Sequence, residues 1–108
     1  MADILPYLER IRDRFSDPAL HESFKDFNKT LLFEFPDTHQ VFLLTMADGQ
    51  ASLEERAIPH PDMKTIANTD VLAGIIDKKI NPVTAFVTRK IKAQGDQGDL
   101  MRLQKLML

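Results

Sequence analysis

Hydrophobic and polar positions recur with a helical period at the start of the chain. Over residues 3–15, apolar side chains are spaced three or four apart and charged side chains fill the other face, which predicts an amphipathic helix. Asp17 followed by Pro18 is typical of a helix start, because Asp caps a helix and proline suits its first position. We therefore expect a second, short helix directly after the first.

The period changes to two from Lys29 onward, which is typical of strands. The pattern predicts strands over residues 29–35, 41–46 and 50–58, separated by turns at residues 36–39 and at Asp48-Gly49. Directly opposed residues of antiparallel strands share one face, so the turn lengths set the register. This register places Phe33 opposite Phe42, and Leu44 opposite both Leu31 and Leu53.

The same register sorts the strand side chains onto two different faces. One face is strongly apolar and receives Leu31, Phe33, Phe35, Phe42, Leu44, Met46 and Leu53. The other face is mixed and receives Leu32, Glu34, Val41, Leu43, Thr45, Ser52, Glu54 and Arg56. A shift of one residue would exchange the faces, so we expect a well-specified register with helices on the apolar face. Glu55 has two interpretations: an edge carboxylate that reaches water, or a polar anchor inside a cavity.

A proline-rich connector at residues 59–61 precedes the second half of the chain, in which strands and helices are interspersed. The pattern predicts strands over residues 63–68 and 91–94, a helix over residues 71–77 capped by Thr69-Asp70, a helix that starts at Asn81-Pro82, and a last helix over residues 99–107. This order indicates an α+β fold with a five-stranded, mainly antiparallel sheet covered by helices on one face. We expect one domain over residues 1–108, because no linker or repeat divides the chain.

Composition narrows the class of protein. Hydrophobic residues make up 44% of the chain, near the globular norm, and the absence of cysteine excludes a disulfide framework and a thiolate metal site. The formal net charge of −2 argues against general nucleic-acid binding, which needs a net basic face. The start lacks signal-peptide features, and no apolar stretch is long enough to span a membrane. We therefore expect a soluble cytoplasmic protein with no cofactor and no nucleic-acid partner.

The sequence contains no catalytic motif that we recognise. The three histidines, His21, His39 and His60, are far apart and show no ligand spacing, and there is no nucleophile elbow or phosphate loop. We therefore expect neither an enzyme nor a metal site. A basic cluster contrasts with the acidic whole and consists of Lys78, Lys79, Arg89, Lys90 and Lys92. This cluster is either a solvated face or a contact for anionic headgroups or for the phosphates of an acyl-coenzyme A.

Several segments resemble the sterol carrier protein-2 family, which includes non-specific lipid-transfer domains. Phe33-Glu34-Phe35-Pro36-Asp37 and the Asp48-Gly49 hairpin are similar to its first half. The more specific motifs are Leu72, Ile75-Ile76, Lys79-Ile80-Asn81-Pro82, Ala85-Phe86, Lys90-Ile91-Lys92 and Gly95-Asp96, at the family's spacing. Residues 98–106 resemble its final helix, so the likeness covers roughly residues 15–107. Two positions depart from the family, which commonly has glycine where this chain has Lys78 and Arg89 at helix ends.

The resemblance implies an apolar cavity between the sheet and its helices, with the final helix near the cavity mouth. It implies binding of a fatty acid, a fatty acyl-coenzyme A, a sterol-like or an isoprenoid lipid, for transfer or for presentation to an enzyme. Together with strand parity and the apolar helix positions, it indicates the residues expected to line the cavity: Phe33, Phe35, Phe42, Leu44, Met46, Leu72, Ile76, Phe86, Leu100, Leu103 and Met107.

Other roles stay open beside lipid transfer. The mixed outer face of the sheet, with Leu32, Val41, Leu43 and Ile58, is a candidate surface for a protein partner or a homodimer, since exposed apolar area often marks an interface. The resembled family also includes quinone-pathway accessory domains, so such a domain without free lipid-transfer activity is an alternative. Transient contact with a membrane surface is a further expected interaction.

Overall fold

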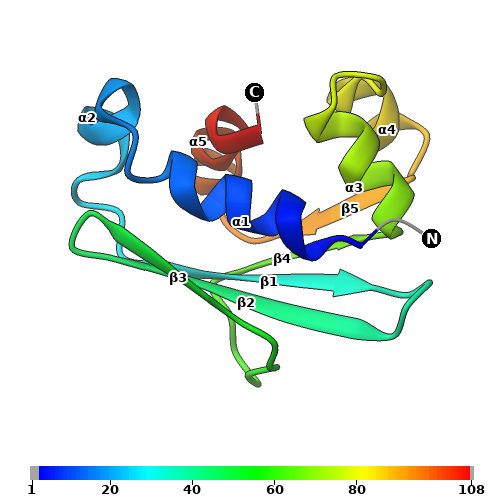
Figure 1. Cartoon of the computed structure of the whole chain (residues 1–108), viewed down its shortest axis with the longest axis horizontal. Helices are drawn as coiled ribbons and strands as arrows, with labels where there is room; N and C mark the ends of the chain where they lie inside the picture. Colours follow the sequence, from blue (N-terminus) through cyan, green and yellow to red (C-terminus); the bar gives the residue numbers. More distant parts are fainter. Residues whose placement is uncertain (1–2, 108) are drawn as a thin grey trace.

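The computed structural model describes residues 3–107, apart from the side chains of residues 21, 23 and 104–107. The sheet forms one layer and the helices form a second layer on one of its faces (Figure 1). In chain order the elements are α1 (Leu5–Arg14), η1 (Pro18–Leu20), α2 (His21–Phe24), β1 (Lys29–Phe35), β2 (Gln40–Ala47), β3 (Gln50–Glu54), β4 (Met63–Ala67), α3 (Thr69–Ile76), α4 (Pro82–Val87), β5 (Ile91–Gln94) and α5 (Gln97–Met107). The predicted α+β class is confirmed.

The five strands lie in the order β3-β2-β1-β4-β5. β1 and β4 run parallel, and the other neighbouring pairs run antiparallel. The predicted register is confirmed, because Phe33 lies opposite Phe42, and Leu44 lies opposite both Leu31 and Leu53. Since opposed side chains share a face, these residues form a continuous apolar surface below the helices. At its centre, Leu44 has 0% of its surface exposed.

The connector between β3 and β4 crosses the outer face of the sheet (Figure 1). β3 ends at Glu54 rather than at residue 58, so the longer predicted strand is wrong. At Glu54 the chain turns away from the sheet edge, and the amide of Arg56 donates to the carbonyl of Glu54 at 3.1 Å. Residues 55–62 then pass below β2 and β1 to reach β4 (Figure 1). Glu55 lies in this connector and is exposed, which favours the interpretation that it reaches water.

The outer face of the sheet is partly covered by this connector. Leu32 and Leu43 point away from the helices, yet they are only 5% and 4% exposed. Leu32 borders a hollow of about 360 Å³ whose other walls are residues 58–64, Gln94 and Gly95. The outer face therefore offers less free apolar surface than the sequence analysis expected, which weakens the case for a homodimer there.

A long-range contact holds the start of α3. The carboxylate of Asp37, in the β1–β2 turn, accepts hydrogen bonds from the amide of Thr69 at 3.1 and 3.2 Å and from its hydroxyl at 2.6 Å. The predicted cap by Thr69-Asp70 is wrong, because the helix already begins at Thr69 and the acceptor comes from a distant turn. Burial raises the pKa of the Asp37 carboxyl, but hydrogen bonds from Thr69 and nearby amides outweigh it and hold that pKa below its usual 3.8.

Two hydrophobic clusters fill the space between the layers. The main cluster joins α1, the segment around α2 and the strands, and includes Leu8, Phe24, Phe33 and Leu44. A smaller cluster of Ala67, Val71, Ile75 and Ala85 lies under α3 and α4. α1 packs across β3 and beside α5, so the main cluster is closed at that end of the sheet. None of the described helices is long and apolar enough to cross a bilayer.

Candidate functional site

An apolar cavity of about 330 Å³ lies between the sheet and the helices, at the border of the two clusters. Natural small-molecule sites span roughly 300–1,000 Å³. The described lining residues are Ile11, Leu31, Phe33, Thr65, Ile75, Pro82, Val83, Phe86, Ile91, Ala93, Gln97, Leu100, Met101 and Leu103. Only Thr65 and Gln97 among them are polar, and none is ionisable. These described residues can therefore recognise a ligand by burial of apolar surface, but not by ion pairing.

Strands form the floor of the cavity, and helices form its walls and its mouth. Thr65 of β4 and Ala93 of β5 lie opposite each other in the sheet, next to the β1 residues of the floor. At the mouth, the α4 residues Val83 and Phe86 are 60% and 59% exposed, and Met101 of α5 is 64% exposed. Large apolar side chains with this exposure show that the cavity opens between α4 and α5.

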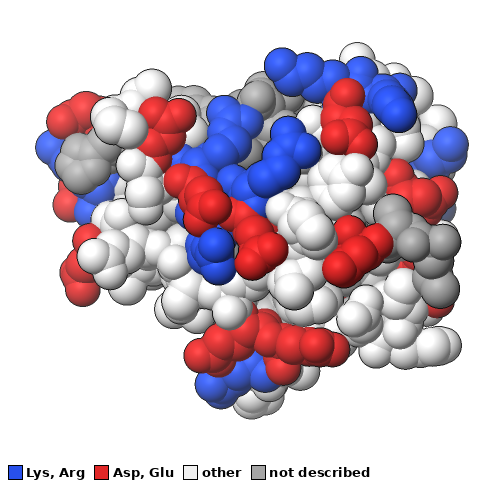
Figure 2. All heavy atoms as spheres, viewed as in Figure 1, with Lys and Arg blue, Asp and Glu red and all other residues white. Residues whose placement is uncertain are grey.

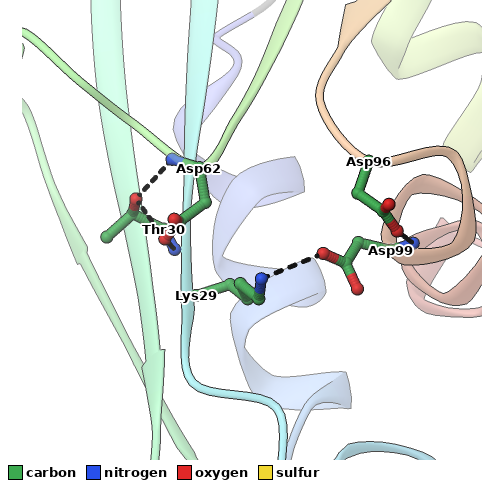
Figure 3. Close-up of polar contacts among 5 residues, drawn as sticks. All are labelled: Lys29, Thr30, Asp62, Asp96 and Asp99. Atoms are coloured by element: carbon green, nitrogen blue, oxygen red, sulfur yellow. Dashed lines mark hydrogen bonds and ion pairs between the residues drawn. The ribbon is translucent and has the colours of Figure 1, made fainter.

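Polar contacts fix the first turn of α5, which is one wall of the cavity (Figure 3). Oδ2 of Asp96 accepts from the amide of Asp99 at 3.0 Å, which caps the helix. α5 therefore begins at Gln97 rather than at the predicted residue 99. Oδ2 of Asp99 also forms an ion pair with Nζ of Lys29 at 3.3 Å, which ties α5 to the start of β1.

A second polar group in Figure 3 joins the floor strands. The amide and the hydroxyl of Thr30 donate to Oδ2 of Asp62 at 2.9 and 3.1 Å, and the amide of Asp62 donates to Oγ1 of Thr30 at 2.9 Å. Thr30 belongs to β1, and Asp62 directly precedes β4. These contacts hold the parallel pair of strands together where the connector enters the sheet.

Short-range features position α3 and α4. Asn81 caps α4, since its Oδ1 accepts from the amides of Val83 at 2.8 Å and Thr84 at 3.3 Å, as the Asn81-Pro82 pattern predicts. In α3, a Cβ on Gly74 would lie 2.5 Å from Cδ1 of Ile80, so glycine lets the following loop close onto the helix. The cavity wall therefore depends on local sequence signals.

The end of α3 is tied to α1 by Asp77. The hydroxyl of Tyr7 donates to Oδ2 of Asp77 at 2.7 Å, and Arg10 lies 3.6 Å from the same carboxylate. The hydrogen bond to Asp77 raises the pKa of the Tyr7 hydroxyl above its usual 10.0. Neither group lines the cavity, and the contacts of both with Asp77 join α1 to the end of α3.

The structure places the sequence-predicted cavity residues in two locations. Phe33, Phe86, Leu100 and Leu103 line the cavity. Six others belong to the main cluster beside it, and these are Phe35, Phe42, Leu44, Met46, Leu72 and Ile76. The side chain of Met107 lies outside the described residues. The division arises because α1 packs across β3 and closes that end of the apolar face, while the space remains above β1, β4 and β5.

The floor residues of β4 and β5 were not among the residues expected to line the cavity. Thr65, Ile91 and Ala93 follow the period-two pattern of their strands, which is the signal that could have placed them on one face. Turn lengths set the register, and thus the face of each side chain, only in the hairpins that connect β1, β2 and β3. The long crossover to β4 carries no such constraint, so the tertiary structure alone brings these residues below the helices.

The described part of the chain offers no candidate metal-binding site. No group of three or more His, Cys, Asp or Glu side chains there could hold a metal ion. The expectation that the protein is not an enzyme stays a prediction.

Comparisons with known proteins connect this arrangement to one family. The sequence model of the SCP-2 sterol transfer family matches residues 8–108. Sterol carrier protein 2 of Gallus gallus is 48% identical over 44 residues, which cover 41% of this chain and 8% of that protein. The matched segment is thus a small part of a much longer relative.

Solved structures share the fold over most of the chain. The solution structure of the sterol carrier protein domain 2 of Helicoverpa armigera has a TM-score of 0.78 and 22% identity, and the match covers 96% of this chain and 84% of that one. The UbiJ-SCP2 ubiquinone synthesis protein has a TM-score of 0.72 and 17% identity, over 99% and 93%. Palmitated SCP2L2 from Aedes aegypti has a TM-score of 0.70 and 15% identity, over 93% and 89%. These structures show the fold, and the family match over nearly the whole sequence shows that the chain belongs to the SCP-2 sterol transfer family.

Proposed function

We propose that this chain binds one lipid with a single apolar chain, of which a fatty acid is the simplest, in the cavity between its sheet and α3–α5. The observation that carries the proposal is an apolar cavity of about 330 Å³ whose described lining residues include no ionisable side chain. Membership in the SCP-2 sterol transfer family supports it, as does a structural relative solved as a palmitated protein. Binding without chemical change of the ligand is part of the proposal.

Burial of apolar surface is sufficient for useful affinity. Each buried methylene contributes roughly 0.8 kcal/mol, so ten would contribute about 8 kcal/mol before the costs of association and ordering. A dissociation constant of about 1 μM corresponds to about −8.2 kcal/mol. Gln97, at the start of α5, is a polar lining residue that can hydrogen-bond the lipid's polar end. We expect micromolar affinity with weak discrimination between similar apolar chains.

Two measurements on purified protein test this proposal. Native mass spectrometry before and after solvent extraction should find a co-purifying lipid that extraction removes. Titration of the extracted protein with a fluorescent fatty acid should show one site per chain, displaced by unlabelled fatty acid. Protein that carries no lipid and binds none of the probe would contradict the proposal.

Presentation of an isoprenoid quinone precursor to a biosynthetic enzyme is the second candidate. The match to the UbiJ-SCP2 ubiquinone synthesis protein favours it, because that match covers nearly all of both chains. Displacement of the fluorescent fatty acid by an isoprenoid quinone, but not by a sterol, would support this role. Vesicle-to-vesicle transfer separates the candidates further, since a presenting domain transfers little free lipid without its enzyme.

The basic cluster at Lys78, Lys79, Arg89, Lys90 and Lys92 bears on the form of the ligand. An acyl-coenzyme A adds phosphates to an apolar chain, and such residues are suited to contact them. Fatty acyl-coenzyme A is therefore the second ligand to test, with tighter binding than the free fatty acid as the expected result. A cytoplasmic location and an organisation as one domain stay predictions.

A further inference from the structure

The mouth of the cavity is surrounded by exposed apolar side chains. Among the described residues, five large hydrophobic side chains are exposed, and four of these lie on α4 and α5: Val83, Phe86, Val87 and Met101, at 60%, 59%, 72% and 64%. Val87 is the most exposed of them and does not line the cavity. A cluster of exposed apolar side chains of this kind is typical of an interaction site.

Basic residues flank the same helix at both ends. Lys78 and Lys79 lie in the loop before α4, and Arg89 and Lys90 lie in the loop after it. In Figure 2, Lys and Arg atoms lie along the edge of the molecule where Figure 1 places these loops. These four residues are exposed, and within the described part of the chain none forms an ion pair. The nearest carboxylate in the sequence, Asp77, is held by Tyr7 and Arg10.

Two of these basic residues occupy backbone positions that favour glycine. Lys78 and Arg89 each have a φ of 62°, in the left-handed region. Both end a helix in the same hydrogen-bonded motif: the amide of Lys79 donates to the carbonyl of Gly74, and the amide of Lys90 donates to that of Ala85, each at 2.8 Å. Glycine would satisfy the motif without steric strain, yet the chain has a long cationic side chain at both sites. Strain kept at two matching sites points to a function for the charges.

We propose that α4, Met101 and these two loops form a docking face for an anionic lipid bilayer. Val83, Phe86, Val87 and Met101 enter the headgroup region, while Lys78, Lys79, Arg89 and Lys90 contact acidic headgroups. The inference rests on the proposed function, because this face surrounds the opening through which a lipid leaves the cavity. Docking there lets the apolar chain pass between bilayer and cavity with little exposure to water.

The double variant Lys78→Gly with Arg89→Gly tests the docking face with two opposite effects. Relief of the left-handed strain should raise Tm by a few degrees, measured at high salt, where attraction of the cations to the helix ends is screened. Loss of two cations should lower partitioning onto vesicles of phosphatidylcholine mixed with phosphatidylglycerol, by about fivefold per charge and thus about 25-fold in total. Partitioning onto phosphatidylcholine alone should change little.

A matched control separates the face from net charge. Lys25→Gln with Arg56→Gln also removes two cations, but from the residue that follows α2 and from the β3–β4 connector, away from the cavity mouth. This control should partition onto the anionic vesicles nearly as the natural protein does. An equal loss in both double variants, or no loss in the glycine variant, would overturn the proposal. A lower Tm in the glycine variant would contradict the strain argument.

A third variant tests the apolar part of the face. Val87→Ser removes an exposed side chain outside the cavity lining, so it should weaken partitioning several-fold while fatty-acid affinity in solution stays unchanged. Fatty-acid titration without vesicles reports on the proposed function alone. If the protein binds no fatty acid in that titration, but still binds vesicles and loses this binding in the variants of the docking face, the proposed function is wrong and the docking face is supported. If the glycine variant lost affinity for acyl-coenzyme A but kept vesicle binding, the cations would serve the ligand and the docking proposal would be wrong.

Discussion

Filling the cavity from its floor should stabilise the protein and weaken lipid binding at the same time. Ala93 lies on β5 opposite Thr65, and both residues line the cavity. The substitution Ala93→Leu adds three carbon atoms to a partly buried position that faces empty space. The ligand and the new side chain would then compete for the same volume.

The magnitude of both effects follows from the carbons added. At roughly 0.8 kcal/mol per buried methylene, three carbons contribute about 2 kcal/mol to the ligand-free protein. For a domain near this size, that corresponds to an increase in Tm of roughly 10 °C. The new side chain also prevents three methylenes of a ligand from being buried. Binding should therefore lose a similar free energy, which raises the dissociation constant roughly 30–60-fold.

Extracted protein is the right material for this test, because bound lipid itself raises Tm. Tm comes from thermal unfolding, and affinity comes from titration with a fluorescent fatty acid. Ala57→Leu is the matched control, since Ala57 is exposed and lines neither the cavity nor the outer hollow, so the variant should change neither quantity appreciably. If Ala93→Leu lowers Tm and binds the probe as tightly as the natural protein, then the space above β5 is not the lipid site.

Three further predictions concern the frame around the cavity. Asp37→Ala should cost about 1 kcal/mol in urea unfolding through loss of the α3 cap, with a larger loss for Asp37→Ala than for Asp37→Asn, since Asn can still accept. Because the pKa of Asp37 is lowered in the folded state, its carboxylate stabilises the protein fully above the usual 3.8, and this stabilisation is lost as the pH falls through the folded-state pKa. The substitution Asp37→Asn should therefore flatten the acid side of a plot of unfolding free energy against pH. An unchanged slope would contradict the assigned hydrogen bonds. Leu44→Ala should cost about 2–5 kcal/mol in urea unfolding, and a cost near zero would be incompatible with its complete burial.

The pattern of the sequence predicted the central hairpins correctly because their constraints are local. The turn lengths and the alternation of apolar residues both act within a few residues, and together they allow one register for Phe33, Phe42 and Leu44. The start of α4 is equally local, since Asn81 and Pro82 act on the first turn that follows them. The resemblance to a lipid-binding family likewise depended on short motifs in a fixed order.

The position of the cavity could not be predicted from the pattern alone, because it depends on where the helices lie. The alternation of strand residues identifies an apolar face of the sheet, but it does not indicate which part of that face α1 covers. α1 packs across β3 and leaves Phe35, Phe42 and Met46 in the core, while the open space lies toward β4 and β5. Volume left between packed side chains is a property of the assembled layers.

Contacts between distant residues were also beyond the sequence. Asp37 caps a helix 32 residues later, and the strand predicted to continue to residue 58 leaves the sheet to cross below it. By itself, the sequence determined the α+β class, the register of the hairpins and the apolar character of one face, because these follow from periodicity and turn chemistry. The parallel pairing of β1 with β4, the position of the cavity and the exposure of its mouth depended on the tertiary structure, because they arise only when segments far apart in the chain pack together.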